Sequence, residues 1–370
     1  MAIDPADRAG AILEIDLAGI AANWRFLARQ VGPASCAAVV KADAYGLGAA
    51  RVSAALAEAG CQLFFTATLD EAIALRDVLP LPSKIAVLNG LLPHCGEEFV
   101  EYRLIPVLND PGQIADWQRI GARQAGLPAM LHLDTGMARL GLTMREFDRV
   151  SDRLEECSAV RWRALISHLA CADDPAHPLN ELQRARFASA RDRLANLPAS
   201  LAASSGIFLG RNYHLDFVRP GAALYGINPH PRAPNPMRQI VHLRGRILQV
   251  RDVDQGQSVG YGATHVMDAP GRLATVAVGY GDGWLRSLSA RGSGRLAGKR
   301  VPLLGRVSMD LVVFDVSDVA PALARPGGFI DLLYEDYGVD AAAADAGTIG
   351  YEILTALGRR HHRIYRSSPS

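Results

Sequence analysis

Apolar and polar positions alternate in two different ways along the chain, and the first pattern fills roughly its first 230 residues. Short runs rich in Val, Ile and Leu are followed there by amphipathic stretches, which is typical of strands followed by helices. A helix near the N-terminus is predicted from apolar residues spaced three and four apart: Leu17, Ile20, Trp24, Leu27 and Val31. Asp16 stands before this helix as a candidate N-cap.

Eight apolar runs in this part predict strands. They cover residues 36–41, 63–66, 84–89, 104–108, 129–134, 163–168, 199–204 and 217–225. Helical stretches lie between most of them, for example 145–157 and 180–196. Successive strand–helix units of this number predict an α/β fold, a TIM-like (β/α)8 barrel.

The second pattern begins after a proline-rich break at 228–237, which interrupts helices and central strands. Strands without long helical stretches between them are predicted at 240–250, 273–278, 301–304, 311–316 and 329–333. We therefore expect a barrel domain over 12–236 and an all-β domain over 237–370, to which residues 1–11 can belong. The tail 361–370 is polar and is expected to be irregular.

Composition narrows the class of protein. Of 370 residues, 49% are hydrophobic and 21% are charged, which excludes a disordered chain, and the formal charge of +1 argues against a nucleic-acid or membrane-surface role. The five cysteines are scattered, without a CxxC pair, which favours a reducing compartment. The polar N-terminus and the lack of a long apolar stretch predict a cytoplasmic protein without a membrane span.

Reactive side chains follow several predicted strands, where such barrels carry their chemistry. Lys41 closes the first strand, as an amine of lowered pKa or as a lysine that extends toward solvent. Arg219 lies in an apolar run and needs a partner, which a structural salt bridge could supply. His168 is a catalytic or a core histidine, and Arg139 is a carboxylate-binding residue or one half of a surface ion pair.

A phosphate site is predicted after the seventh and eighth strands, in 204–206 and 219–222, where hydroxyl and backbone N–H groups would suit a dianion. An ordinary turn is the alternative for Ser-Ser-Gly at 204–206. No metal is expected, because neither 168–173 nor the doublet 361–362 is matched by a second cluster at zinc spacing. The segment 279–283 lacks the spacing of a dinucleotide fingerprint.

Eight segments, taken together, resemble those of the alanine racemases, pyridoxal-phosphate enzymes of fold type III. In the family's order they are residues 39–48, 134–141, 167–173, 216–226, 258–264, 278–284, 305–310 and 347–352. The resemblance covers nearly the whole chain. It implies an isomerase, cytoplasmic and homodimeric, that interconverts L- and D-alanine and supplies D-alanine for peptidoglycan.

The resemblance also implies roles for single residues. Lys41 and Tyr261 resemble the two catalytic bases, for the D- and L-enantiomer respectively. The residues that resemble the pyridoxal 5′-phosphate site are Lys41, Tyr45, His168, Ser204, Arg219, Gly221, Ala222 and Tyr351. Arg139 and Met309 resemble the substrate contacts, and Tyr280 resembles part of the entry corridor. The family's shared sites imply that Tyr261, Tyr280 and Met309 serve the neighbouring subunit.

One departure and three alternatives remain open. His132 stands where the family often has a carbamylated lysine, so another group must position Arg139. A racemase of serine or lysine would use the same two bases with a different pocket. A decarboxylase of basic amino acids should lack the tyrosine base, and a non-catalytic pyridoxal-phosphate carrier should lack the β domain.

Overall fold

The computed structural model describes residues 4–124, 126–154 and 159–367. The chain forms two compact units, one of Ile20–Arg238 and one of Met1–Gly19 with Gln239–Ser370. Cys157, the end of the predicted helix 145–157 and the last three residues of the predicted tail lie outside the described residues. Among the residues described, none of the helices is both long and apolar enough to span a membrane.

The unit Ile20–Arg238 is built on a parallel sheet. Seven strands form it in the order β3-β4-β5-β6-β7-β8-β9. They are β3 (Ala38–Val39), β4 (Leu63–Thr66), β5 (Lys84–Val87), β6 (Ile105–Leu108), β7 (Leu127–His132), β8 (Val160–Ile166) and β9 (Ala199–Ser200). Strand order follows chain order, as expected when each strand is connected to the next by a helix.

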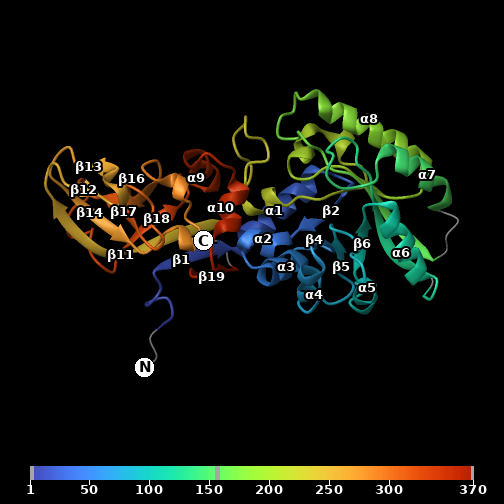
Figure 1. Ribbon diagram of the computed structural model, residues 1–370, viewed down its shortest axis with the longest axis horizontal. Coiled ribbons are helices and arrows are strands. Elements are labelled where there is room, and N and C mark those ends of the chain that lie inside the picture. The colour runs from blue at the N-terminus through green and yellow to red at the C-terminus, as the bar shows by residue number, and fades with distance from the viewer. Residues whose placement is uncertain (1–3, 125, 155–158, 368–370) are drawn as a thin grey trace. The chain divides into compact units, whose positions relative to one another are not determined.

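Helices flank these strands (Figure 1). They are α1 (Leu17–Gln30), α2 (Lys41–Gly46), α3 (Ala49–Glu58), α4 (Leu69–Arg76), α5 (Gly96–Glu101), α6 (Pro111–Gly121), α7 (Met144–Leu154) and α8 (Pro178–Arg193), with the 3-10 helices η1 (Ser205–Leu209), η2 (Arg211–Tyr213) and η3 (Ala222–Tyr225). Local sequence explains several starts. Asp16 accepts a hydrogen bond from the Gly19 N–H, and Asp110 caps the helix that begins with Pro111.

The last predicted strand of this unit is much shorter than expected. Only β10 (Phe217–Val218) is a strand, and it pairs in parallel with β2 (Ser35–Cys36). The prediction of a strand to residue 225 is wrong because Pro220 has no N–H and Ala222–Tyr225 turn into a 3-10 helix. The Arg219 N–H still donates to the Ala202 carbonyl, and the Val39 N–H donates to the Pro220 carbonyl.

The other unit is built on a mostly antiparallel sheet of eight strands, in the order β14-β17-β16-β15-β18-β11-β1-β19. Its strands are β1 (Ala11–Asp16), β11 (Val241–Val253), β14 (Gly271–Val276), β15 (Ser293–Leu296), β16 (Lys299–Leu304), β17 (Val312–Asp315), β18 (Phe329–Leu333) and β19 (His362–Arg366), with β12 (Ser258–Val259) and β13 (His265–Val266) as a separate hairpin. An additional pairing of β14 with β11 closes six of the strands into a ring. The 3-10 helices are η4 (Tyr261–Ala263), η5 (Tyr280–Asp282) and η6 (Arg286–Leu288).

Two expectations about this unit are wrong. It contains the helices α9 (Val339–Ala346) and α10 (Gly350–Ala356), so it is not all-β. The tail is not irregular, because β19 pairs in parallel with β1, Leu13 opposite Arg363. The partner of β19 lies near the N-terminus, so a local sequence pattern does not predict this pairing. This pairing and that of β1 with β11 place Ala11–Asp16 in this unit.

Candidate active site

Lys41 opens a left-handed turn instead of ending a strand. Strand β3 ends at Val39, and residues 42–45 have φ values between 52° and 57°. The turn is held by hydrogen bonds from the Ala44 N–H to the Val40 carbonyl and from the Gly48 N–H to the Asp43 carbonyl. A left-handed conformation costs a non-glycine residue roughly 1–2 kcal/mol, so strain is concentrated beside the lysine.

The environment of Lys41 favours a neutral amine. Burial lowers the pKa of its ammonium, the positive charge of Arg139 lowers it further, and the carboxylate of Glu71 opposes both. Of the two interpretations of this lysine, the structure favours the amine of lowered pKa. Such an amine can act as a nucleophile or as a base near neutral pH.

Arg219 lies buried near this lysine without a carboxylate partner among the described residues. Its Nη1 donates to the Ser200 carbonyl at 2.9 Å and to the Ser200 Oγ at 2.5 Å, and its Nη2 donates to the Ser167 carbonyl. Burial lowers the pKa of this guanidinium to about 10, so it remains a cation at neutral pH. The salt-bridge alternative is therefore wrong within the described chain, and the guanidinium is held by neutral oxygens.

Two histidines beside these cations are neutral. Burial, the charge of Arg219 and that of Arg139 lower the pKa of His168 to about 3, with smaller contributions from Lys41 and His132. Burial and Arg219 likewise lower the pKa of His132 to about 4. These mutual effects place the five basic groups in one cluster at the ends of β3, β7, β8 and β10.

The tautomer of His132 follows from its neighbour. The amide NH2 of Asn109 donates hydrogen bonds to the Leu88 and Val107 carbonyls, so its Oδ1 is the atom that faces His132 as an acceptor. The Nδ1 of His132 lies 2.7 Å from that oxygen and must be the donor. The Nε2 of a neutral His132 is then an acceptor in a cluster of cations. Asn109 was not among the residues singled out from the sequence.

The predicted phosphate loops meet at Ser204. Its Oγ accepts hydrogen bonds from the N–H groups of Gly221 and Ala223, both at 3.1 Å, which leaves its own proton to donate. A Cβ at Gly221 would lie 2.5 Å from the Tyr45 hydroxyl. Tyr45 itself packs against Tyr225, with ring centroids 4.7 Å apart. The structure therefore brings Tyr45, Ser204 and residues 221–222 together.

The Arg139 loop and a buried amide complete this side of the site. The Asp134 carboxylate accepts from the N–H groups of residues 136, 137 and 138, which fixes the loop that carries the exposed Arg139. The fully buried Gln183 donates to the His168 carbonyl and to Thr135 Oγ1, and accepts from the Ala170 N–H. Sequence reasoning missed Gln183, since nothing local marks a polar residue on a helix as buried.

The remaining predicted residues lie in the other unit, Tyr261 and Tyr280 in the 3-10 helices η4 and η5, Tyr351 in α10 and Met309 on a loop. Tyr261 is 72% exposed, and Tyr280, Met309 and Tyr351 are exposed as well. The Gly281 N–H donates to the Met309 carbonyl at 2.8 Å, so the loops of Tyr280 and Met309 lie against each other. A Cβ at Gly279 would lie 2.3 Å from that carbonyl, which explains glycine in the 279–283 segment.

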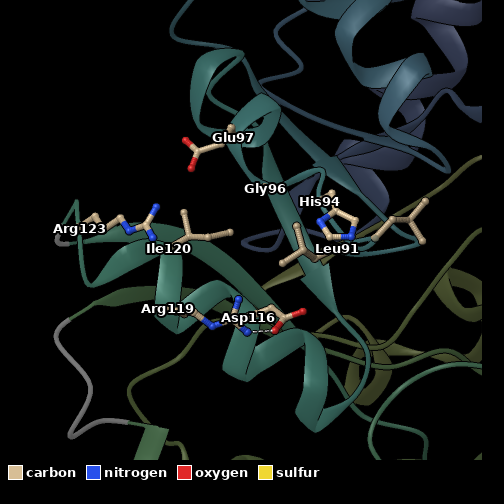
Figure 2. A pocket seen from close by; sticks show the side chains of 9 residues that line it. Leu91, His94, Gly96, Glu97, Asp116, Arg119, Ile120 and Arg123 are labelled. Atoms are coloured by element: carbon tan, nitrogen blue, oxygen red, sulfur yellow. Dashed lines mark hydrogen bonds and ion pairs between the residues drawn. The ribbon is translucent and has the colours of Figure 1, made fainter.

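A further pocket lies on α5, α6 and the loop before α5 (Figure 2). It is lined by Leu91, Leu92, His94, Gly96, Glu97, Asp116, Arg119, Ile120 and Arg123. None of the predicted site residues lines it, and Arg119 is engaged by Asp116. Over the described ranges, no three His, Cys, Asp or Glu side chains are grouped to hold a metal ion.

Comparison with known proteins decides the family. The model described as alanine racemase, N-terminal domain, matches residues 15–229, and the model described as alanine racemase, C-terminal domain, matches residues 240–365. The chain belongs to the alanine racemase family.

Relatives in this family match over nearly their whole length. An alanine racemase of Rhodospirillum rubrum is 53% identical over 97% of this chain and 96% of its own. A catabolic alanine racemase of Mesorhizobium japonicum is 48% identical over 96% and 93%. The crystal structure of the Bartonella henselae alanine racemase, with covalently bound pyridoxal phosphate, superposes with a TM-score of 0.93 at 39% identity, over 97% of this chain and 100% of that one.

Proposed function

We propose that this chain is an alanine racemase that uses pyridoxal 5′-phosphate, with Lys41 and Tyr261 as its two bases. The observation that carries the proposal is the cluster around Lys41. A half-buried amine of lowered pKa lies there with the buried cation Arg219, the cation Arg139 and two neutral imidazoles. Such a cluster suits a ligand that brings several negative charges.

The residues present fit pyridoxal phosphate. The Ser204 hydroxyl and the backbone at Gly221 and Ala222 would hold its phosphate, with Tyr45 and Tyr351 as further contacts. Lys41 would bind its aldehyde carbon covalently, and Arg219 would face its ring nitrogen with His168 beside it. When bound, the cofactor supplies an electron sink that makes the Cα proton of an amino acid easier to remove.

Arg219 would limit that electron sink. A guanidinium donates hydrogen bonds but does not give up its proton near neutral pH, so it would leave the ring nitrogen unprotonated. The Ser200 and Ser167 oxygens fix the guanidinium, so it would stay directed at that nitrogen. We expect this arrangement to favour return of the Cα proton over transamination.

Racemisation needs proton transfer on both faces of the substrate. One base would have to cross the substrate plane, whereas two opposed bases act without such motion. Lys41 would take the proton of D-alanine and Tyr261 that of L-alanine. Arg139 and Met309 would hold the substrate carboxylate, and Tyr280 would line the entry. The Nε2 acceptor of His132 would orient Arg139 in place of a carbamylated lysine.

The assembly and the domains follow from the same proposal. Residues 217–220 would act as the eighth strand of a closed (β/α)8 barrel, since they hydrogen-bond to residues 39 and 202. The two compact units would be the cofactor domain and the β domain, with the boundary near residue 238. A homodimer would bring Tyr261, Tyr280 and Met309 to the neighbour's cofactor. Location in the cytoplasm and supply of D-alanine for peptidoglycan remain predictions.

A substrate panel tests this function. The purified protein with pyridoxal phosphate is incubated with each enantiomer of alanine, serine and lysine, and the products are separated by chiral chromatography. We expect alanine to racemise fastest and Lys41→Ala to lower the rate about 10³-fold or more. Faster serine or lysine turnover would change the substrate. Cofactor binding without turnover of any of them would indicate a carrier.

A further inference from the structure

Glu71 connects the segment after Lys41 to the neighbouring strand. Its Oε1 accepts the Ala42 N–H at 2.7 Å, and its Oε2 accepts the Ala67 N–H at 2.8 Å. Ala42 is the first residue of the left-handed turn, and Ala67 directly follows β4. One carboxylate therefore joins the loops that leave two adjacent strands.

The anchor of this carboxylate is a helix cap. Glu71 is the third residue of α4 and forms a capping box with Thr68, whose Oγ1 accepts the Glu71 N–H at 3.4 Å. A capping box needs only one carboxylate oxygen for its own helix. Here Oε2 faces residues 67 and 68, and Oε1 is directed to Ala42.

The turn needs such a partner because its conformation is unfavourable for the residues that form it. Residues 42–45 include no glycine, and Ala42 and Asp43 are exposed, so packing does little to hold the first half of the turn. A hydrogen bond to an ionised acceptor is about twice as strong as a neutral one. The Glu71 contact falls on the peptide directly after Lys41.

We propose that Glu71 is a positioning residue for Lys41, whose carboxylate holds the left-handed turn to the end of β4 and so fixes the direction of the lysine amine. The catalytic meaning of that direction rests on the function proposed above. The charge of Glu71 also acts on the lysine. It raises the pKa of Lys41 against burial and Arg139, while the neutral His168 faces the same amine.

The chain offers a matched control at α7. Glu146 forms the same kind of box with Thr143, accepting the Thr143 N–H at 2.9 Å and the Thr143 hydroxyl at 2.8 Å. Over the described residues its carboxylate is bonded to Thr143 and not to residues 41–47, and the residue is half-buried. Glu146→Gln therefore removes the charge from a helix cap of the same type without touching the lysine segment.

The test compares Glu71→Gln and Glu146→Gln in the full-length protein with bound pyridoxal phosphate. Glutamine has one acceptor oxygen, and its amide NH2 would face a backbone donor, so it cannot serve both N–H groups. We expect hydrogen–deuterium exchange of a peptide over 38–48 to rise about tenfold in Glu71→Gln and to stay unchanged in Glu146→Gln.

Kinetics provide the second readout. In Glu71→Gln we expect kcat for alanine to fall about 10- to 100-fold, with KM within about twofold, because a misplaced base lowers kcat more than binding. The acid limb of kcat in the D-to-L direction should also move to lower pH, since removing the carboxylate lowers the pKa of Lys41. Glu146→Gln should change neither quantity.

Each outcome bears on one proposal. If the 38–48 peptide exchanges equally in Glu71→Gln and the parent, the Glu71 proposal is wrong, whatever the activity. If the parent does not racemise alanine, the proposed function is wrong even where exchange depends on Glu71. Should Glu71→Gln fail to fold, Glu71→Asp keeps the charge but shortens the side chain. Unchanged hydrogen–deuterium exchange of the 38–48 peptide in Glu71→Asp would also contradict the proposal that Glu71 positions Lys41.

Discussion

The two units hold their candidate site residues in opposite ways. In Ile20–Arg238, the guanidinium of Arg219 and the amide of Gln183 are buried and fixed by hydrogen bonds to the backbone and to other side chains. In the other unit, Tyr261 is 72% exposed and lies between two glycines of positive φ, Gly260 and Gly262. The site residues of Ile20–Arg238 are therefore held in fixed positions. Those of the other unit are exposed aromatic side chains, and the backbone around Tyr261 is conformationally free because of its glycines.

This contrast separates two kinds of work. Charges that act on a cofactor must be held where water cannot screen them, which requires a buried and fully hydrogen-bonded surround. A second base that must meet a substrate face has to be reachable. Exposure of Tyr261 is therefore consistent with a group that is covered only in an assembly, whereas exposure of Arg219 would weaken its effect.

The contrast is sharpest for Tyr261→Phe. Since the side chain is exposed, we expect the free energy of unfolding to change by less than about 0.5 kcal/mol. Racemisation should fall about 10²- to 10⁴-fold, the usual contribution of a general base. The two enantiomers are equal in free energy, so kcat/KM must fall equally in both directions.

Exchange of the Cα proton with heavy water then separates the two bases. In Tyr261→Phe, D-alanine should still exchange through Lys41 while L-alanine loses exchange along with racemisation. Mass spectrometry of each recovered enantiomer measures this. Equal exchange of both enantiomers in the variant would assign the second base to another residue.

The buried cluster should make stability depend on pH. Folded His132 and His168 have pKa values of about 4 and about 3, whereas an unfolded histidine titrates near 6.5. As pH falls from 6.5 toward 4, these histidines become protonated in the unfolded chain but stay neutral in the folded chain. The free energy of unfolding therefore falls, by about 1.4 kcal/mol per pH unit for each imidazole.

Urea unfolding at several pH values measures that slope. His132→Gln and His168→Gln should each flatten it between pH 6 and 4.5. The pKa of the buried His361 in the other unit is also lowered by burial, so His361→Gln gives the corresponding measurement there. If neither His132→Gln nor His168→Gln changes the slope, these imidazoles are not neutral in the folded state.

Sequence patterns predicted the strand–helix alternation, because apolar periodicity is local. They did not predict the left-handed turn at 42–45, which contains no glycine to mark it, or strand β19, whose partner is residues 11–16. The resemblance supplied the list of site residues. Asn109 and Gln183 were not predicted as site residues, since their roles depend on burial, which the local sequence does not show. The Thr68-x-x-Glu71 capping-box pattern, in contrast, is present in the sequence itself.

A smaller effect is expected for Arg360, in the unit that carries the exposed residues Tyr280 and Met309. Its Nε lies 3.0 Å from the buried carboxylate of Asp282, and its Nη1 lies 2.8 Å from Asp310. These acids flank Tyr280 and Met309. Arg360→Ala should lower the free energy of unfolding by about 1 kcal/mol, because Asp282 loses a charged donor. KM for alanine should rise by roughly two- to fivefold as these loops loosen.

Arg119→Ala is the control for that variant. Arg119 pairs with Asp116 three residues away on α6, both of them exposed, and such pairs contribute little. We expect a change below about 0.5 kcal/mol and no change of KM. Steady-state kinetics and thermal unfolding of both variants measure the difference. Equal effects of the two substitutions would mean that Arg360 is an ordinary surface cation.

The last prediction concerns backbone strain, which affects stability and not the chemistry. Ala42 is exposed with φ 52° and ψ 48°, where glycine avoids a cost of about 1–2 kcal/mol but loses about 0.5–1 kcal/mol through the freedom of the unfolded chain. Ala42→Gly should therefore stabilise the protein, by about 0.5–1 kcal/mol. Ala344→Gly, at an exposed position of the right-handed α9, should destabilise it by about as much. The same substitution thus changes sign between the two units, and denaturant unfolding of both variants measures it. Equal destabilisation by the two substitutions would mean that the turn after Lys41 carries no strain. The turn would then not need the Glu71 carboxylate to hold it in place.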